Sequence, residues 1–156
     1  MLRDTNGYSP VTTFSRSFRK LSMLLEVSDM KDSEADLPLS IPGNERAFTY
    51  YPPLRRVKEY IEKNWAEPIT LSDAARVAAM EASYFSTFFH SKIGIPFSDW
   101  LRRIRVAKAI EMIQEEDRSI CDVAFAVGFN DLRTFGRAFK RYTQSTPMNF
   151  KKACRP

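Results

Sequence analysis

Three cationic side chains recur at helical spacing late in this chain of 156 residues. Arg133, Arg137 and Lys140 are separated by four and then three residues, so a helix places them on one face. An arginine guanidinium can donate to O6 and N7 of guanine together, and a lysine ammonium can reach a phosphate. No Asp or Glu occurs from position 132 to 152 to neutralise this face. Such an unrelieved cationic helix is suited to the grooves and phosphates of a nucleic acid.

The opposite side of the same segment is aromatic, and it predicts how the helix is held. Phe135, Phe139 and Tyr142 fall on one side, which leaves Leu132 and Gly136 on the outer side with the three cations. Packing of the aromatic side against a preceding helix would therefore turn the cations outward. The helix is expected to begin after an N-cap that is Asp131 or, as the neighbouring candidate, Asn130.

The cationic helix belongs to the second copy of a degenerate repeat. Each copy opens with a hydroxyl residue followed three positions later by an acid, Thr70 with Asp73 and Ser119 with Asp122, as in a capping box. An offset of 49, which becomes 50 beyond the turn, aligns the two copies. The aligned pairs are Leu71 with Ile120, Ala75 with Ala124, Ala78 with Val127, Ala79 with Gly128, Phe85 with Phe135, Phe89 with Phe139 and Trp100 with Phe150. Small residues facing aromatic ones allow the close helix crossing of a helix-turn-helix.

Further helices are predicted before and between the copies. Val57 to Trp65 and Pro96 to about Glu116 both carry apolar residues at helical spacing. A helix of about 20 residues spans about 30 Å, and successive major grooves on one face of B-DNA lie about 34 Å apart. The predicted fold is therefore all-α, with two helix-turn-helix subdomains joined by a long linker helix. One chain could place two recognition helices in neighbouring grooves of double-stranded DNA.

Charge and cysteine usage narrow the class of protein. The net charge is +5, but residues 1–50 carry −1 and the remaining residues +6, which favours an acidic partner for the later part. Cys121 and Cys154 lie far apart without a nearby histidine, so neither a disulfide framework nor a metal site is predicted, and no cofactor is expected. No apolar run approaches the roughly 18 residues of a membrane span, and no secretory signal is present. We expect a cytoplasmic protein without a membrane partner.

The first 52 residues differ in pattern from the rest of the chain. Between Ser28 and Tyr51, acidic residues and prolines occur without sustained periodicity, as is typical of linkers. Upstream, Phe14 to Val27 could form a short amphipathic helix that either docks a partner or is the remnant of a dimerisation element. The expected organisation is a partly disordered N-terminal extension and linker over 1–52, the double helix-turn-helix domain over 53–152 and a tail over 153–156.

The second copy resembles a known family of regulators. Its sequence SICDVAFAVGFND over Ser119–Asp131 continues with FGRAFKR over Phe135–Arg141 and with Thr146 and Pro147. From about residue 54 to residue 152, the chain resembles the DNA-binding domain of the AraC/XylS family of bacterial transcription regulators. The resemblance implies two helix-turn-helix subdomains that bind asymmetric sites and commonly activate transcription by contacting RNA polymerase.

The resemblance, carried over by position, assigns candidate DNA contacts to both recognition helices. In the second helix, Arg133 and Arg137 would contact bases or phosphates, Leu132 could meet a thymine methyl group and Lys140 could reach a phosphate. In the first helix, Phe85, Phe88 and Phe89 are expected in the core. The outward candidates there are Ser83, Ser86, Thr87 and His90.

The first copy departs from the family pattern in ways that weaken its charge. Thr87 and His90 stand where Arg and Lys are common, Ala79 replaces the usual turn glycine, and Glu81 replaces a common serine N-cap. Glu81 would either oppose DNA or merely close the helix turn. In the second copy, Gln144 replaces a common glycine. Because the first copy neutralises fewer phosphates, we expect the second to supply more of the affinity.

Other functional classes are weighed against DNA recognition. Catalysis is not expected, because His90 is the only histidine and neither a nucleophile with a triad partner nor a phosphate-binding glycine loop is present. The rival is a helical adaptor, or a competitor of longer relatives, whose basic face binds protein while DNA binding is weak. Nonspecific architectural DNA binding is a third interpretation.

Regulation and assembly are expected to differ from those of longer family members. Two recognition helices in one chain make a monomer on DNA sufficient. The 52 residues ahead of the domain are too few for the ligand-binding barrel of longer family members. Control by abundance, a partner or proteolysis is therefore expected.

Overall fold

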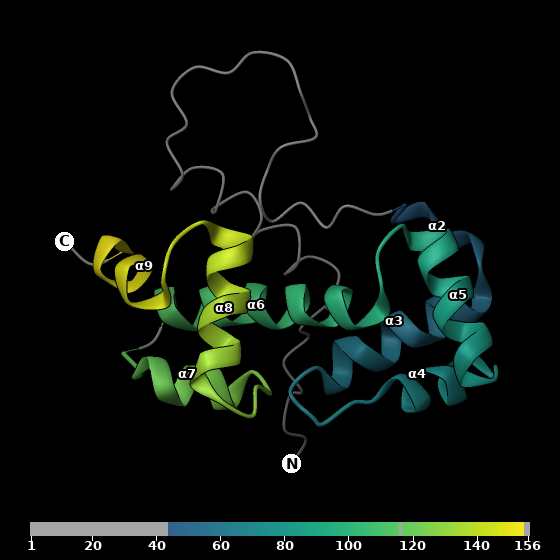
Figure 1. Cartoon of the computed structure of the whole chain (residues 1–156), viewed down its shortest axis with the longest axis horizontal. Helices are drawn as coiled ribbons and strands as arrows, with labels where there is room; N and C mark the ends of the chain where they lie inside the picture. Colours follow the sequence, from purple (N-terminus) through teal and green to yellow (C-terminus); the bar gives the residue numbers. More distant parts are fainter. Residues whose placement is uncertain (1–43, 116, 155–156) are drawn as a thin grey trace, which may run out of the picture. The chain divides into compact units, whose positions relative to one another are not determined.

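The structure is a computed structural model that describes residues 44–115 and 117–154. These residues form helices without a strand, which confirms the all-α prediction (Figure 1). The helices are α2 (Arg46–Tyr50), α3 (Pro52–Asn64), α4 (Leu71–Ala78), α5 (Ala82–Ile93), α6 (Phe97–Glu115), α7 (Ile120–Ala126), α8 (Leu132–Thr143) and α9 (Pro147–Cys154). The segment Phe14 to Val27 lies outside the described residues. None of the described helices is both long and apolar enough to cross a bilayer.

Two helix pairs, α4 with α5 and α7 with α8, form the two predicted helix-turn-helix units. The long helix α6 connects them and packs against helices of both (Figure 1). α3 packs on α4 in the first unit, and α9 packs on α8 in the second. The predicted linker helix is therefore present, and it forms part of the core of each unit.

The aromatic residues of the repeat occupy equivalent places in the two cores. Phe85 and Phe89 are fully buried with ring centroids 5.6 Å apart, and Phe135 and Phe139 are buried at the same 5.6 Å separation. Each second ring then meets the aromatic residue that follows in the repeat, with Phe89 at 5.5 Å from Trp100 and Phe139 at 5.5 Å from Phe150. The alignment made from sequence thus corresponds to a repeat in three dimensions.

The short helix α2 extends the first unit toward the N-terminus. Phe48 is 4% exposed and stacks on Trp100 with a centroid distance of 5.1 Å. The sequence pattern placed this stretch in the linker, because one phenylalanine among polar residues produces no periodicity. The structure instead makes residues 46–50 a helix whose aromatic side chain completes the core of the first unit.

The two prolines that follow α2 begin α3 rather than end a linker. Pro52 opens the helix at N1, where its missing amide hydrogen costs no helical hydrogen bond. The helix predicted around Val57 to Trp65 is confirmed, and its apolar residues Leu54, Val57 and Ile61 are fully buried.

Four turn positions of the described chain adopt left-handed backbone conformations. Ala79 and Gly128 follow the first helix of each unit with φ of 57° and 87°, and Gly94 and Gln144 follow the second with φ of 92° and 59°. Each unit therefore has glycine at one of these turns and a residue with a side chain at the other. A non-glycine residue in this conformation costs about 1–2 kcal/mol. The departures at Ala79 and Gln144 are thus places of backbone strain.

Substitutions at two of these turns and at one glycine inside α8 should raise the free energy of unfolding. Ala79→Gly and Gln144→Gly are each expected to stabilise the fold by about 0.5–1 kcal/mol, because relief of the left-handed strain exceeds the added entropy of the unfolded chain. Gly136 lies inside α8 with no positive φ, and a Cβ added there would meet nothing within 4 Å, so Gly136→Ala should also stabilise, by about 0.5–1 kcal/mol. Urea unfolding of the three variants measures these changes. Destabilisation by Ala79→Gly would contradict the strain argument.

Candidate nucleic-acid interface

The outward face of α8 carries the cations predicted from sequence. Arg133, Arg137 and Lys140 are exposed, and Leu132 beside them is 46% exposed. Within the described residues, none of the three cations forms a salt bridge. The next cation, Arg141, points instead toward Asp99 of α6, with 4.0 Å between Nη2 and the carboxylate oxygen. The face around Arg133 therefore keeps its positive charge available to an external anion.

The start of α8 is fixed by a carboxylate cap. Asp131 is the N-cap, and its Oδ1 accepts a hydrogen bond of 2.7 Å from the Thr134 backbone amide. This confirms Asp131 as the cap in preference to Asn130. The hydrogen bonds from Thr134 hold the pKa of Asp131 below its usual value, and the charge of Arg137 lowers the pKa further. The cap aligns the first turn of α8, which carries Leu132 and Arg133.

The corresponding face of α5 is polar but lacks Lys and Arg. Ser83, Ser86, Thr87 and His90 are all exposed, as predicted. The Ser83 hydroxyl donates to the Glu81 carboxylate at 2.5 Å, and the Thr87 hydroxyl donates to the Ser83 carbonyl at 3.2 Å. Both hydroxyl protons are therefore engaged within the chain, while the oxygen atoms remain able to accept from a base amino group.

Glu81 closes the first turn of α5. Its Oε2 accepts hydrogen bonds from the backbone amides of Ser83, at 2.9 Å, and Tyr84, at 3.1 Å. The hydrogen bonds from Ser83 and then Tyr84 hold the pKa of this carboxyl below its usual value. Of the two roles considered for Glu81, helix capping is the one that its contacts show.

The repeat gives a direct comparison of the two faces. At the offset of 50, Ser83 corresponds to Arg133, Thr87 to Arg137 and His90 to Lys140. All six side chains are exposed on a helix of 12 residues that follows a carboxylate N-cap. The two units thus present the same surface positions with different chemistry, hydroxyl and imidazole groups on α5 and cations on α8.

An aromatic cluster beside α5 was not anticipated from the sequence. Tyr84 is 61% exposed and stacks on Phe88 at 6.1 Å, and Phe88 meets Tyr51 edge-on at 5.6 Å. The ammonium of Lys92 lies 5.2 Å from the Tyr51 ring centroid and 6.0 Å from that of Phe88. Phe88 was expected in the core, but it is half-buried because its neighbours are these surface aromatics. In the sequence, the signal that could have indicated this cluster is the four-residue spacing of Tyr84, Phe88 and Lys92, which places them on one face of a helix.

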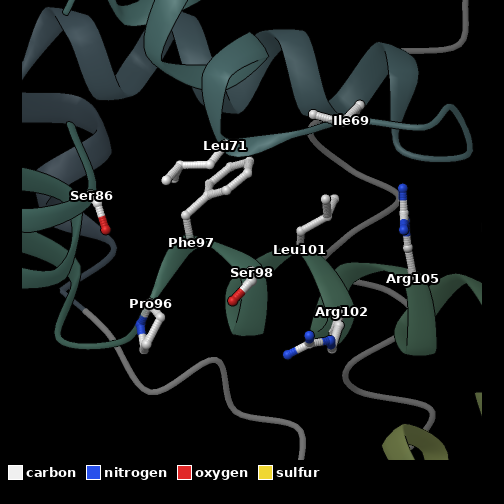
Figure 2. Close-up of a pocket in the computed structure, with 9 residues that line it drawn as sticks. All are labelled: Ile69, Leu71, Ser86, Pro96, Phe97, Ser98, Leu101, Arg102 and Arg105. Carbon is white, nitrogen blue, oxygen red and sulfur yellow. The ribbon is translucent and has the colours of Figure 1, made fainter. Parts of the chain in front are cut away.

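A shallow hollow of 280 Å³ lies between the start of α4, α5 and α6. Figure 2 shows Phe97 and Leu101 of α6 pointing toward the segment that carries Ile69 and Leu71, with Ser86 of the α5 face on one side. Arg102, on the rim, is paired with Asp99 at 2.8 Å. The lining is mixed, because Ser86, Ser98 and two arginines stand beside the apolar side chains. Arg102 and Arg105 both have partners within the protein, so the hollow adds no free charge to the surface of α5.

Comparisons with known proteins agree with this geometry. A family model described as a helix-turn-helix domain matches residues 74–153. The HTH-type transcriptional regulator GlxA of Rhizobium meliloti is 32% identical over 108 residues, which cover 69% of this chain and 33% of GlxA. The chain spans about a third or less of the length of the curated relatives that it matches.

Two solved structures illustrate the likeness of the fold. The C-terminal domain of the two-component response regulator yesN from Fusobacterium nucleatum is 30% identical, with a TM-score of 0.58 over 61% of this chain and 93% of that one. The DNA-binding domain of AdpA, solved in complex with a target DNA, is 27% identical, with a TM-score of 0.63 over 66% of this chain and 93% of that one.

The cap of α8 predicts a specific dependence of stability on pH. Because the folded pKa of Asp131 is lowered, its contribution is present above the unfolded value of about 3.9 and is lost as pH falls through the folded value. Asp131→Asn keeps an oxygen acceptor for the Thr134 amide but does not titrate. The stability difference between wild type and Asp131→Asn should therefore shrink between pH 7 and pH 3, as measured by urea unfolding. Glu59→Gln, at an exposed position on α3, is the control. An equal difference at both pH values would contradict this role.

Proposed function

Because this chain belongs to the AraC-type helix-turn-helix family of DNA-binding domains, we propose that it regulates transcription by inserting α5 and α8 into successive major grooves of an asymmetric site. The observation that carries the proposal is the exposed cationic face of α8, which has no salt-bridge partner within the described residues. Burying such charges against phosphates releases counterions, which is the main source of affinity for DNA. We place the recognition domain over 53–152, with α2 as the part of the 1–52 extension that packs on it.

Each exposed residue of α8 has a role suited to its chemistry. Arg133 and Arg137 donate to guanine edges or phosphates, because a guanidinium presents two parallel N–H groups. Leu132, 46% exposed at the start of the helix, meets a thymine methyl group. Lys140, near the end of the helix, contacts a phosphate, which positions the helix without selecting a sequence. These assignments make α8 the main source of both specificity and affinity.

The first recognition helix contributes less binding energy in this proposal. Ser83, Ser86, Thr87 and His90 can hydrogen-bond to bases, but they replace few counterions. The carboxylate of Glu81 at the start of α5 adds a negative charge close to these residues. We therefore assign to α5 a supporting role in which it extends the site rather than anchors it.

The effect on transcription and the assembly on DNA belong to the same proposal. We infer that the chain acts in the cytoplasm as a monomer on its site and activates transcription through contact with RNA polymerase. The support is the family membership together with the presence of two recognition helices in one chain. A site read by two unlike helices is necessarily asymmetric, so a second copy of the chain is not required by symmetry.

A protein-binding adaptor is the second candidate function. It is favoured by the aromatic cluster beside α5, where Tyr84 is 61% exposed. Tyr50, 77% exposed, extends that cluster, because its ring centroid lies 4.9 Å from that of Tyr51. Large exposed aromatics are enriched at protein interfaces. Selection of bound duplexes from a random DNA pool distinguishes the two functions. An asymmetric motif about two helical turns long supports the regulator, and absence of any enriched motif favours the adaptor.

Substitution of the α8 arginines should weaken binding at particular base pairs. Arg133→Ala and Arg137→Ala are each expected to cost about 1–3 kcal/mol on the selected site and to relax preference at the position contacted. Titrations on selected and scrambled duplexes measure the effect. Lys63→Ala removes one exposed positive charge from α3 and serves as the matched control. Equal losses on both duplexes would show that the arginines supply charge only.

Salt dependence should differ between the two recognition helices. Lys140→Gln is expected to reduce the slope of log affinity against log salt by about 1, the value for one lost phosphate contact, while Thr87→Gln leaves the slope unchanged. Footprinting of wild type at increasing salt tests the same difference on the two half-sites. Equal salt sensitivity over both half-sites would contradict the unequal roles of α5 and α8.

A further inference from the structure

A half-buried arginine of the linker helix contacts the first helix-turn-helix unit through side-chain hydrogen bonds. Arg105 of α6 donates from Nε to the Trp65 carbonyl at 2.9 Å and from Nη2 to the Glu67 carbonyl at 2.7 Å. Trp65 is the C-cap of α3, so the guanidinium holds the loop that ends α3 in the first unit. Arg105 is half-buried and forms no salt bridge within the described residues.

The electrostatics of Arg105 differ from those of the outward arginines. Carbonyls at a helix C-terminus carry a partial negative charge that attracts a cation. Burial lowers the pKa of Arg105, and the charge of Arg102 lowers it further. Such a half-buried guanidinium needs its hydrogen-bond partners, because leaving donors unsatisfied is costly. Arg105 therefore favours one fixed arrangement of α6 and the 65–67 loop.

The turn between α7 and α8 in the second unit lies against the same 65–67 loop. Gly128, between α7 and α8, approaches so closely that an added Cβ would lie 2.6 Å from the Ala66 carbonyl oxygen and 3.1 Å from Cζ of Arg105. Only glycine permits this approach without displacement of the backbone. We call the meeting of the 65–67 loop, Arg105 and Gly128 the Arg105 junction. It brings together the first unit, the linker helix and the second unit.

We propose that the Arg105 junction fixes the orientation of α8 relative to α5 and thereby sets the spacing of half-sites that the chain accepts. The inference rests on the proposed function for its DNA consequence, but the orientation itself does not depend on DNA. Inserting one base pair rotates the half-sites by about 35° and separates them by about 3.4 Å. The second unit is held both by α6 and by the approach of Gly128 to the junction. It cannot rotate and move with the shifted half-site unless the contacts of Arg105 break.

The chain offers a matched control for each side of the junction. Arg56 has the same chemistry as Arg105, because it donates from Nε to the Val77 carbonyl at 3.2 Å and from Nη2 to the Ala78 carbonyl at 3.0 Å. Those contacts lie wholly within the first unit. Gly94 has a φ of 92°, close to the 87° of Gly128, but an added Cβ there would meet nothing within 4 Å. Arg56→Met therefore removes a like pair of side-chain donors, and Gly94→Ala places a side chain at a like positive φ, without touching the junction.

The first experiment measures orientation in the absence of DNA. Spin labels at the exposed positions Ser91 and Asn149, in the full chain with Cys121 and Cys154 replaced by serine, report the distance between α5 and α9. We expect Arg105→Met, which keeps the aliphatic stem, to broaden the distance distribution about twofold. Arg56→Met should leave the width unchanged. Likewise, Gly128→Ala should shift the distribution, whereas Gly94→Ala should not.

The second experiment measures spacing on DNA. Wild type should lose at least about tenfold in affinity when one base pair is inserted between the half-sites of its selected duplex, and Arg105→Met should lose at most about threefold. A folded Arg105→Met with wild-type distances and the wild-type penalty overturns the inference, as do equal effects of Arg56→Met. If wild type selects no bipartite duplex, the proposed function fails while the label distances still decide the role of the junction.

Discussion

Burial of the aromatic side of α5 and of α8 is the constraint on which the surface of this domain depends. Phe85 and Phe89 fill one core, and Phe135 and Phe139 fill the other with the same centroid separation of 5.6 Å. Loss of one such ring typically costs about 3–5 kcal/mol, so neither helix can turn about its axis to offer a different face. Small residues of α4 and α7 are buried as well, and they allow α4 to pack closely on α5 and α7 on α8. The residues opposite the rings are therefore held outward whatever their chemistry.

The two units use that shared scaffold differently. α8 places cations at positions where α5 has hydroxyl and imidazole groups, and α5 adds a flank of partly exposed aromatics around Tyr84 and Phe88. Backbone strain is also divided between them, with Ala79 in the turn of the first unit and Gln144 after α8. A duplicated fold can tolerate such divergence because the buried rings, rather than the surface residues, maintain each unit.

The linker helix α6 does more than separate the units. Its buried residues include Trp100, Val106 and Ile113, which do not lie along a single narrow stripe, because helices of both units pack on it. Trp100 belongs to the core that contains Phe48 and Phe89. Arg105 then adds hydrogen bonds to a loop outside the helix. Rigidity between the units thus arises from shared packing together with a polar contact.

The sequence by itself determined the helices from α3 to α8, the repeat and the outward residues of α8, because local periodicity and capping fix which side of a helix is apolar. Arg133, Arg137 and Lys140 lie where the pattern predicted, and Asp131 caps the helix. Only the tertiary structure decided what depends on contacts between residues distant in the chain. Phe48 joins a core through Trp100, 52 positions away, and Arg105 meets Trp65 and Gly128 from separate elements. Neither contact leaves a periodic trace, since each depends on one side chain meeting a distant partner.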